Sequence, residues 1–168
     1  MAKRGARQRG FSLIELMFVV AIIGVIAMVA VPAYTKQIQK NQRAVAKARL
    51  AQAAQLLERF YSDNNSYFVD ATGGNLTVNT TNSTAAGFAL LMRVPSGTTV
   101  YSGSNNETTS AYTITLATAT ANNYVLTATV VPTNAQSADL CGNLTLTNTG
   151  VKGVTGTDPN AATVPNCW

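Results

Sequence analysis

The pattern of apolar and polar positions divides the chain into segments of different character. Residues 1–10 are basic, and residues 11–34 are almost entirely apolar, with Glu15 as the single charged side chain among them. A helix needs roughly 20 residues, or about 30 Å, to cross the hydrocarbon core of a membrane. The pattern therefore predicts a membrane-spanning helix over residues 11–34.

From residue 35 the pattern changes to that of an amphipathic helix. Apolar side chains recur at spacings of 4, 3, 4 and 3 residues, at Ala46, Leu50, Ala53, Leu57 and Phe60. This spacing places them on one face of a helix over residues 35–61, and such a face is expected to pack against a folded domain. Short polar side chains at 62–65 compete for backbone hydrogen bonds, so we expect the helix to end there.

Residues 62–168 have the composition of a β-rich head. Three runs rich in Thr, Val and Leu alternate between apolar and polar positions, at 112–116, 123–131 and 143–147. Their short connections favour an antiparallel meander, with one face on the helix and a Thr-rich face toward water. A long connection at 64–110 contains a small apolar knot at 88–92. The expected fold class is α+β, a long N-terminal helix packed on a small antiparallel sheet.

The net charge of +5 does not by itself indicate a nucleic-acid-binding protein. Removing residues 1–10 leaves 8 basic and 7 acidic residues, a net charge of +1. From residue 60 onward only Arg93 and Lys152 are basic, against five acidic residues. A head with this balance does not attract phosphates over its whole surface, although a local basic strip remains open.

Nothing in the composition indicates an enzyme. Histidine, the commonest general base and metal ligand, is absent. The sequence suggests no catalytic residue, no metal site and no cofactor, and we expect a structural or binding protein.

Two ordinary explanations of the apolar segment have to be weighed. A secretory signal peptide has a shorter apolar core and a cleavage site of small residues, for which residues 27–31 are a weak candidate. A plain single-pass anchor fits the length equally well. In either case the basic residues before the segment favour a cytoplasmic N-terminus.

The string Gly10-Phe11-Ser12-Leu13-Ile14-Glu15-Leu16-Met17, between a basic segment and a long apolar run, decides between these alternatives. It resembles the signature of type IV pilins, and the likeness extends over residues 10–34. The resemblance implies the pilin fold, cleavage by a prepilin peptidase between Gly10 and Phe11, and N-methylation of Phe11. Glycine at the cut leaves the backbone unobstructed, in line with this expectation.

Glu15 is the second residue to which the resemblance assigns a role. A charged side chain inside a membrane helix costs roughly 2.5–3.5 kcal/mol on insertion scales, so it needs a partner or a place at the membrane edge. The family implies the free amine of Phe11 in a neighbouring subunit as that partner, which would set the axial register. Gly24 and Pro32 are expected to loosen the helix on assembly, although ordinary membrane helices also tolerate both residues.

Cys141 and Cys167 are the only cysteines, and a head outside the cytoplasm favours a disulfide over two free buried thiols. The closing segment, from Cys141-Gly142-Asn143 to Cys167-Trp168, resembles the end of type IVa minor pilins. Major pilins also carry such a loop, so the choice between major and minor subunit stays open.

The resulting expectation is a structural subunit of a type IV pilus, acting in pilus assembly, adhesion or twitching motility. It would insert in the bacterial inner membrane with its N-terminus cytoplasmic and then pass into an extracellular pilus. The implied partners are other pilin subunits, a prepilin peptidase, an inner-membrane assembly platform and, before extraction, membrane lipid.

Two alternatives remain. One is a pilus-borne DNA receptor or adhesin, for which Tyr61, Tyr67 and Tyr101 offer a conceivable stacking surface. The other is a pseudopilin of a type II secretion system, which shares the leader motif and often holds calcium. Asp139 and Asp158 are too few ligands for such a site.

Overall fold

The computed structural model describes residues 11–68, 91–93, 99–103, 110–156 and 164–168. The predicted leader with Gly10, and residues 88–90 of the apolar knot, lie outside the described residues. The chain divides into two compact units, Met1–Ile38 and Gln39–Trp168.

One helix, α1, covers Leu13–Asn64 and contributes to both units. It contains Pro32, and the hydroxyl of Thr35 donates a hydrogen bond to the Pro32 carbonyl oxygen (2.9 Å). The helix ends at Asn64, within the short polar segment 62–65 where its end was predicted. Asn65 has a φ of 52°, the left-handed conformation that Asn tolerates after a helix, and its N–H donates to the Tyr61 carbonyl oxygen (2.7 Å).

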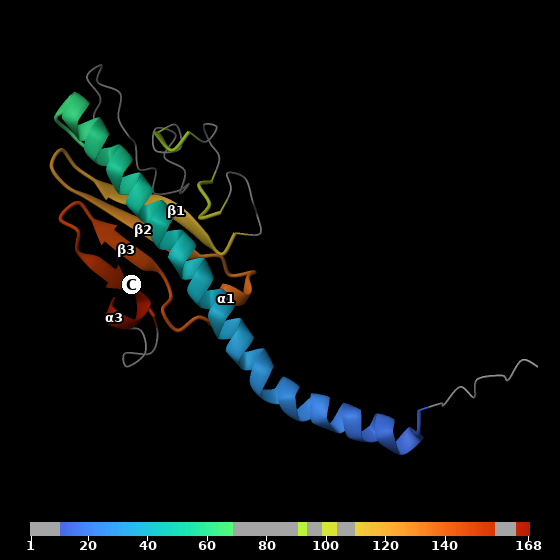
Figure 1. Cartoon of the computed structure of the whole chain (residues 1–168). Helices are drawn as coiled ribbons and strands as arrows, with labels where there is room; N and C mark the ends of the chain where they lie inside the picture. Colours follow the sequence, from blue (N-terminus) through green and yellow to red (C-terminus); the bar gives the residue numbers. More distant parts are fainter. Residues whose placement is uncertain (1–10, 69–90, 94–98, 104–109, 157–163) are drawn as a thin grey trace, which may run out of the picture. The chain divides into compact units, whose positions relative to one another are not determined.

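The sheet is an antiparallel meander of β1 (Tyr112–Ala119), β2 (Tyr124–Val130), β3 (Leu144–Thr147) and β4 (Lys152–Val154), shown in Figure 1. Its spatial order, β1-β2-β3-β4, is the order along the chain. The first three strands were predicted, whereas β4 was not. A short 3-10 helix, η1 (Ala135–Ala138), precedes β3, and α3 (Val164–Cys167) follows β4.

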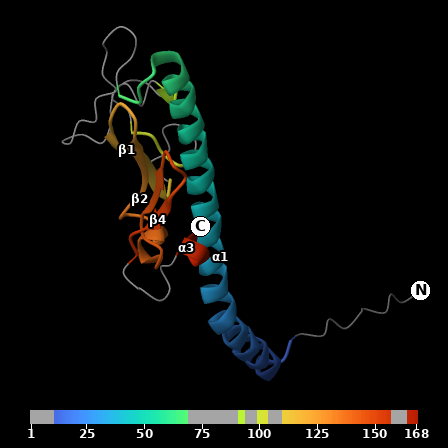
Figure 2. The same ribbon diagram turned by 90° about the vertical axis from the view of Figure 1, so that its left-hand side faces the viewer.

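The core lies between the sheet and the part of α1 that begins at Gln39, which runs along one sheet face (Figures 1 and 2). The helix contributes the predicted stripe of buried residues, and β1, β2 and β3 contribute the facing apolar side chains. The fully buried members include Ala46, Leu50, Ala53, Leu57, Ile114, Leu126, Ala128 and Leu144, with Phe60 half-buried. The expected fold class is confirmed.

The opposite sheet face carries threonines in register. Thr115 pairs with Thr127, Thr127 pairs with Thr145, and Thr145 pairs with Gly153. These threonines are half-exposed. A Cβ atom on Gly153 would clash with the Thr145 hydroxyl, so any larger residue at this edge position needs the Thr145 side chain to shift.

Candidate functional site

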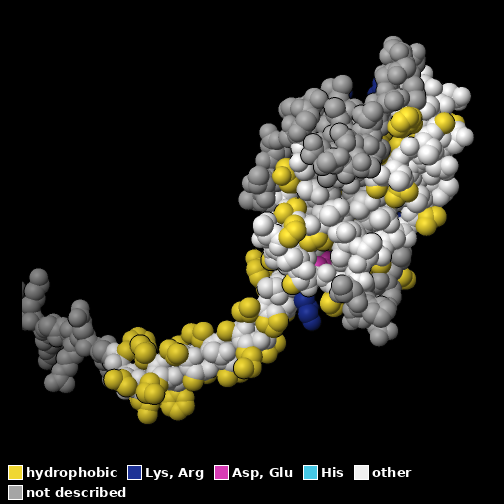
Figure 3. Space-filling view, turned by 180° about the vertical axis from the view of Figure 1, so that it is seen from behind, with side chains coloured by type: hydrophobic (Ala, Val, Ile, Leu, Met, Phe, Trp, Pro, Cys, Tyr) yellow, Lys and Arg dark blue, Asp and Glu magenta, His cyan; other side chains and the backbone are white. Residues whose placement is uncertain are grey.

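The first half of α1 exposes apolar side chains on all sides. Phe11 is 82% exposed, and every residue from Leu13 to Tyr34 is exposed in the isolated chain. Figure 3 shows apolar side chains along this stretch. Among the described residues, α1 is the one helix long and apolar enough to cross a membrane. A helix that is apolar all round is stable when lipid or other helices surround it.

The predicted assembly residues all lie in this stretch. Glu15 occupies the first turn of α1, four residues after Phe11, which precedes the helix. Beyond its chain neighbours and the helix backbone around it, Gly24 has no described atom within 4 Å of where a Cβ would lie, so its surface is open to a neighbouring helix. Pro32 lies inside the helix. Their roles in cleavage, register and flexibility stay predictions.

A disulfide joins Cys141 to Cys167, with the two Cα atoms 5.7 Å apart. Both cysteines are buried. The closed loop contains β3, β4 and α3, so the bond fastens the sheet edge to the C-terminal segment.

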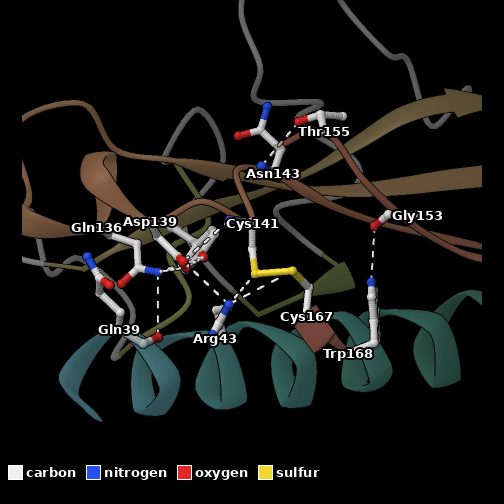
Figure 4. The surroundings of a disulfide bond; sticks show 11 residues. Gln39, Arg43, Gln136, Asp139, Cys141, Asn143, Gly153, Thr155, Cys167 and Trp168 are labelled. Atoms are coloured by element: carbon white, nitrogen blue, oxygen red, sulfur yellow. Dashed lines mark hydrogen bonds and ion pairs between the residues drawn. A yellow bond between two sulfur atoms is a disulfide. The ribbon is translucent and has the colours of Figure 1, made fainter. Parts of the chain in front are cut away.

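Arg43 of α1 points at this disulfide, as Figure 4 shows. Its Nη1 atom forms an ion pair with Asp139 Oδ1 (3.4 Å), contacts Cys141 Sγ and lies 3.9 Å from Cys167 Sγ. The Arg43 and Asp139 side chains are only 13% and 5% exposed. The helix is therefore tied to the disulfide by a nearly buried, compensated charge pair.

Gln136 links the same group to the core. Its buried side-chain amide donates to Tyr112 Oη (3.0 Å), to the Gln39 carbonyl oxygen (3.5 Å) and to Asp139. Burial, and next the negative charge of Asp139, raise the pKa of Tyr112 to about 12. The Tyr112 phenol therefore stays neutral through the physiological range.

Lys152 of β4 lies against the ring of the C-terminal tryptophan. Lys152 Nζ sits 5.3 Å from the centroid of the Trp168 ring, and Trp168 Nε1 donates to the Gly153 carbonyl oxygen (3.0 Å; Figure 4). Burial lowers the pKa of Lys47, and the positive charges of Arg43 and Lys152 lower it further.

The candidate stacking tyrosines do not form an exposed surface. Tyr67 is buried, stacks on Tyr61 (ring centroids 4.5 Å apart) and meets Tyr124 edge-on (4.8 Å). The Glu58 carboxylate accepts hydrogen bonds from Tyr67 Oη (2.8 Å) and Tyr124 Oη (3.2 Å). These aromatic residues join the end of α1 to β2. Tyr101 is half-buried in an isolated bridge to Thr113.

Sequence reasoning missed the contacts of Arg43 with Asp139 and the disulfide, and the contact of Lys152 with Trp168. Arg43 belongs to the helix and Asp139 to the head, and no pattern along the chain relates the two residues. The signal available was the position of Arg43, seven residues before Leu50 and therefore on the same helix face as the buried stripe. In the described ranges no group of three or more Cys, Asp or Glu side chains could hold a metal, and Asp158 lies outside them.

A helix that is apolar at its start and supports a disulfide-closed sheet at its end is the architecture of a pilin. Residues 5–31 match the prokaryotic N-terminal methylation motif. Residues 32–145, more than half of the chain, match the family described as "Type IV minor pilin ComP, DNA uptake sequence receptor". The chain belongs to this family of type IV minor pilins, and membership implies assembly with other pilin subunits.

Two relatives are described as a type IV major pilin and as a fimbrial protein. The chain is 41% identical over 61 residues to the type IV major pilin protein PilA of Myxococcus xanthus, covering 36% of this chain and 28% of that protein. It is 39% identical over 74 residues to the fimbrial protein EcpC of Eikenella corrodens, covering 43% and 48%. The alignments thus span about a quarter to a half of these relatives.

A solved structure, that of the Neisseria meningitidis non-core minor pilin PilV, is similar to this chain at 16% identity and a TM-score of 0.45. The match covers 73% of this chain and 91% of PilV.

Proposed function

We propose that this chain is a subunit of a type IV pilus, cut by a prepilin peptidase between Gly10 and Phe11 and polymerised through its N-terminal helix. The observation that carries the proposal is the wholly exposed apolar half of α1. Before assembly lipid covers it, with the N-terminus on the cytoplasmic side of the inner membrane. In the filament, neighbouring helices replace the lipid, a transfer between two apolar surroundings that needs an assembly platform to drive it.

Glu15 gives this assembly its register. Glu15 follows four residues after Phe11, whose amine becomes free when the leader is removed. A carboxylate in an apolar bundle is stabilised by a cation at hydrogen-bonding distance, and the Phe11 amine of a neighbouring subunit provides one. The pairing fixes one axial offset between subunits, because any other offset leaves two unpaired charges.

The Glu15→Ala variant tests the pairing. We expect cleavage and N-methylation of Phe11 to continue, measured by mass spectrometry of the membrane fraction. The variant subunit should be missing from sheared, purified pili. Ser12→Ala, three residues earlier in the same segment, is the matched control and should assemble. Incorporation of Glu15→Ala at the control's level would refute the pairing.

A second candidate function is retention of DNA by the pilus. The observation that favours it is the match of residues 32–145 to a family described as a DNA uptake sequence receptor. The test is retention of duplex DNA by the full chain in non-ionic detergent, measured across salt concentrations. Absence of binding at low salt would remove this candidate and leave the filament role untouched. A type II secretion pseudopilin is less favoured, since both relatives named above are pilus proteins.

A further inference from the structure

The disulfide lies against a cation that is closer to one of its two sulfur atoms than to the other. Nη1 of Arg43, on α1, contacts Cys141 Sγ and lies 3.9 Å from Cys167 Sγ (Figure 4). The same nitrogen pairs with Asp139 Oδ1 (3.4 Å), and its two N–H groups can serve the carboxylate and the Cys141 sulfur at once. A disulfide sulfur is uncharged and accepts only weakly. A thiolate at Cys141 would instead form a charge-assisted hydrogen bond with Arg43.

Other ionisable groups near Cys141 come from the helix, the sheet and the turn before β3. Asp139 opposes a thiolate at Cys141 by its own negative charge, which Arg43 balances in the ion pair. Tyr112 of β1 is neutral, because burial raises its pKa to about 12. Lys47 follows Arg43 by four residues on α1 and adds positive charge to that part of the helix. Arg43 is therefore the group that decides whether a Cys141 thiolate is stable.

The two cysteines also differ in how firmly their segments are held. Cys141 precedes β3, which pairs with strands on both sides, and its N–H donates to Asp139 Oδ1 (3.4 Å). Cys167 ends α3, a four-residue helix beside the edge strand β4. Both cysteines are buried, so a thiol reaches one of them only after a local opening, and displacing α3 exposes Cys167 at the lower cost. A main-chain carboxylate at Trp168 would also disfavour a thiolate at Cys167.

We propose that Arg43 makes Cys141 the sulfur that leaves when the disulfide opens and attacks when it closes. A thiolate of an external dithiol attacks Cys167 Sγ and forms a mixed disulfide, and the electron pair of the old S–S bond leaves on Cys141 beside Arg43. The second thiol of the reductant then displaces Cys167. The dithiol ends as a disulfide, its two electrons pass to the two cysteines, and its two protons pass to Cys167 and to Cys141 or solvent. Closure by a disulfide oxidant follows the same steps in reverse.

This arrangement links the loop to the helix. Because Arg43 belongs to α1, the Cys141 thiolate is stabilised only in a head on which α1 is docked. The loop therefore closes fastest after docking, and the finished disulfide marks a subunit whose helix is in place. The link goes beyond the filament role, since it concerns how each head matures.

The first test measures reduction of the full chain by dithiothreitol in non-ionic detergent near neutral pH, with free thiols alkylated and counted by mass spectrometry. Arg43→Gln should be reduced about tenfold more slowly, and its equilibrium constant for reduction should fall about tenfold, or about 30 mV for two electrons. Asp139→Asn breaks the same ion pair but keeps the cation, so it should be reduced faster than wild type. Arg43→Lys should restore most of the rate, and Lys40→Gln, at an exposed position of α1, should react like wild type.

The opposite signs separate this role from a purely structural one. If the ion pair only held the fold together, both variants would weaken the head and both would be reduced faster. A shift of Arg43→Gln and Asp139→Asn in the same direction would therefore overturn the proposal. A mixed disulfide with glutathione that forms on Cys141 instead of Cys167 would overturn it as well.

The second test follows each thiol alone, through the pH dependence of its alkylation by iodoacetamide. Cys167→Ser leaves Cys141 as the single thiol, and Cys141→Ser leaves Cys167. Alkylation should begin at lower pH in Cys167→Ser than in Cys141→Ser. Adding Arg43→Gln to Cys167→Ser should move its profile toward that of a free thiol, centred near about pH 8.5. Identical Cys141 profiles with and without Arg43 would refute the stabilisation of the thiolate.

Discussion

Replacing both cysteines by serine tests how the C-terminal loop stabilises the head. The disulfide closes a separation of 26 residues. Restricting the unfolded chain over such a loop contributes about 3.5 kcal/mol in the chain-entropy treatment. The Cys141→Ser/Cys167→Ser variant should therefore lose about that much free energy of unfolding. With a urea m-value of about 2 kcal/mol/M, its midpoint should fall by about 1.8 M.

The assay can use a probe that the chain already contains. Trp168 is the single tryptophan and is half-buried beside the disulfide, so its fluorescence should report unfolding of the head. The full chain in non-ionic detergent is titrated with urea, and the reduced wild type serves as control and should match the double variant. A midpoint within 0.5 M of the oxidised wild type (about 1 kcal/mol) would show that loop closure does not stabilise this head.

Three further expectations concern the core and the sheet edge. Leu50→Ala should cost about 2–5 kcal/mol in the same urea titration, whereas Leu140→Ala, at a side chain 52% exposed, should stay within about 0.5 kcal/mol. Gly153→Ala should cost about 1–3 kcal/mol through its clash with Thr145, and adding Thr145→Ala should recover part of the loss. Because its pKa is raised to about 12, Tyr112 favours the folded state fully below about pH 10. This contribution should fade between about pH 10 and 12, and a fluorescence titration of Tyr112→Phe should lack that part of the alkaline transition.

Patterns that act over a few residues were readable in the sequence. The apolar run at 11–34, the stripe from Ala46 to Leu57 and the three longer strands follow from spacing alone, because each repeats the period of its element. Strand β4 was not predicted because Lys152–Val154 is three residues long, contains a glycine and shows no alternation of apolar and polar residues. Its pairing is specified by β3.

Contacts between distant segments were not readable. The ion pair between Arg43 and Asp139 depends on how α1 is rotated about its axis and how it crosses the sheet. Propensity and periodicity do not determine this packing geometry. For the same reason, counting charges along the chain could not decide whether a local basic strip forms on the head.

The sheet order has a consequence for the course of folding. Because β1, β2, β3 and β4 pair only with their neighbours along the chain, the meander has low contact order and should form rapidly. The helical stripe at 46–57 reaches its sheet partners only across the long segment before Tyr112, so docking of the helix should be the slower step. In the head, the C-terminal sheet would then fold first and the helix would dock on it afterwards. A subunit tethered by its anchor would present its helix to an already formed sheet.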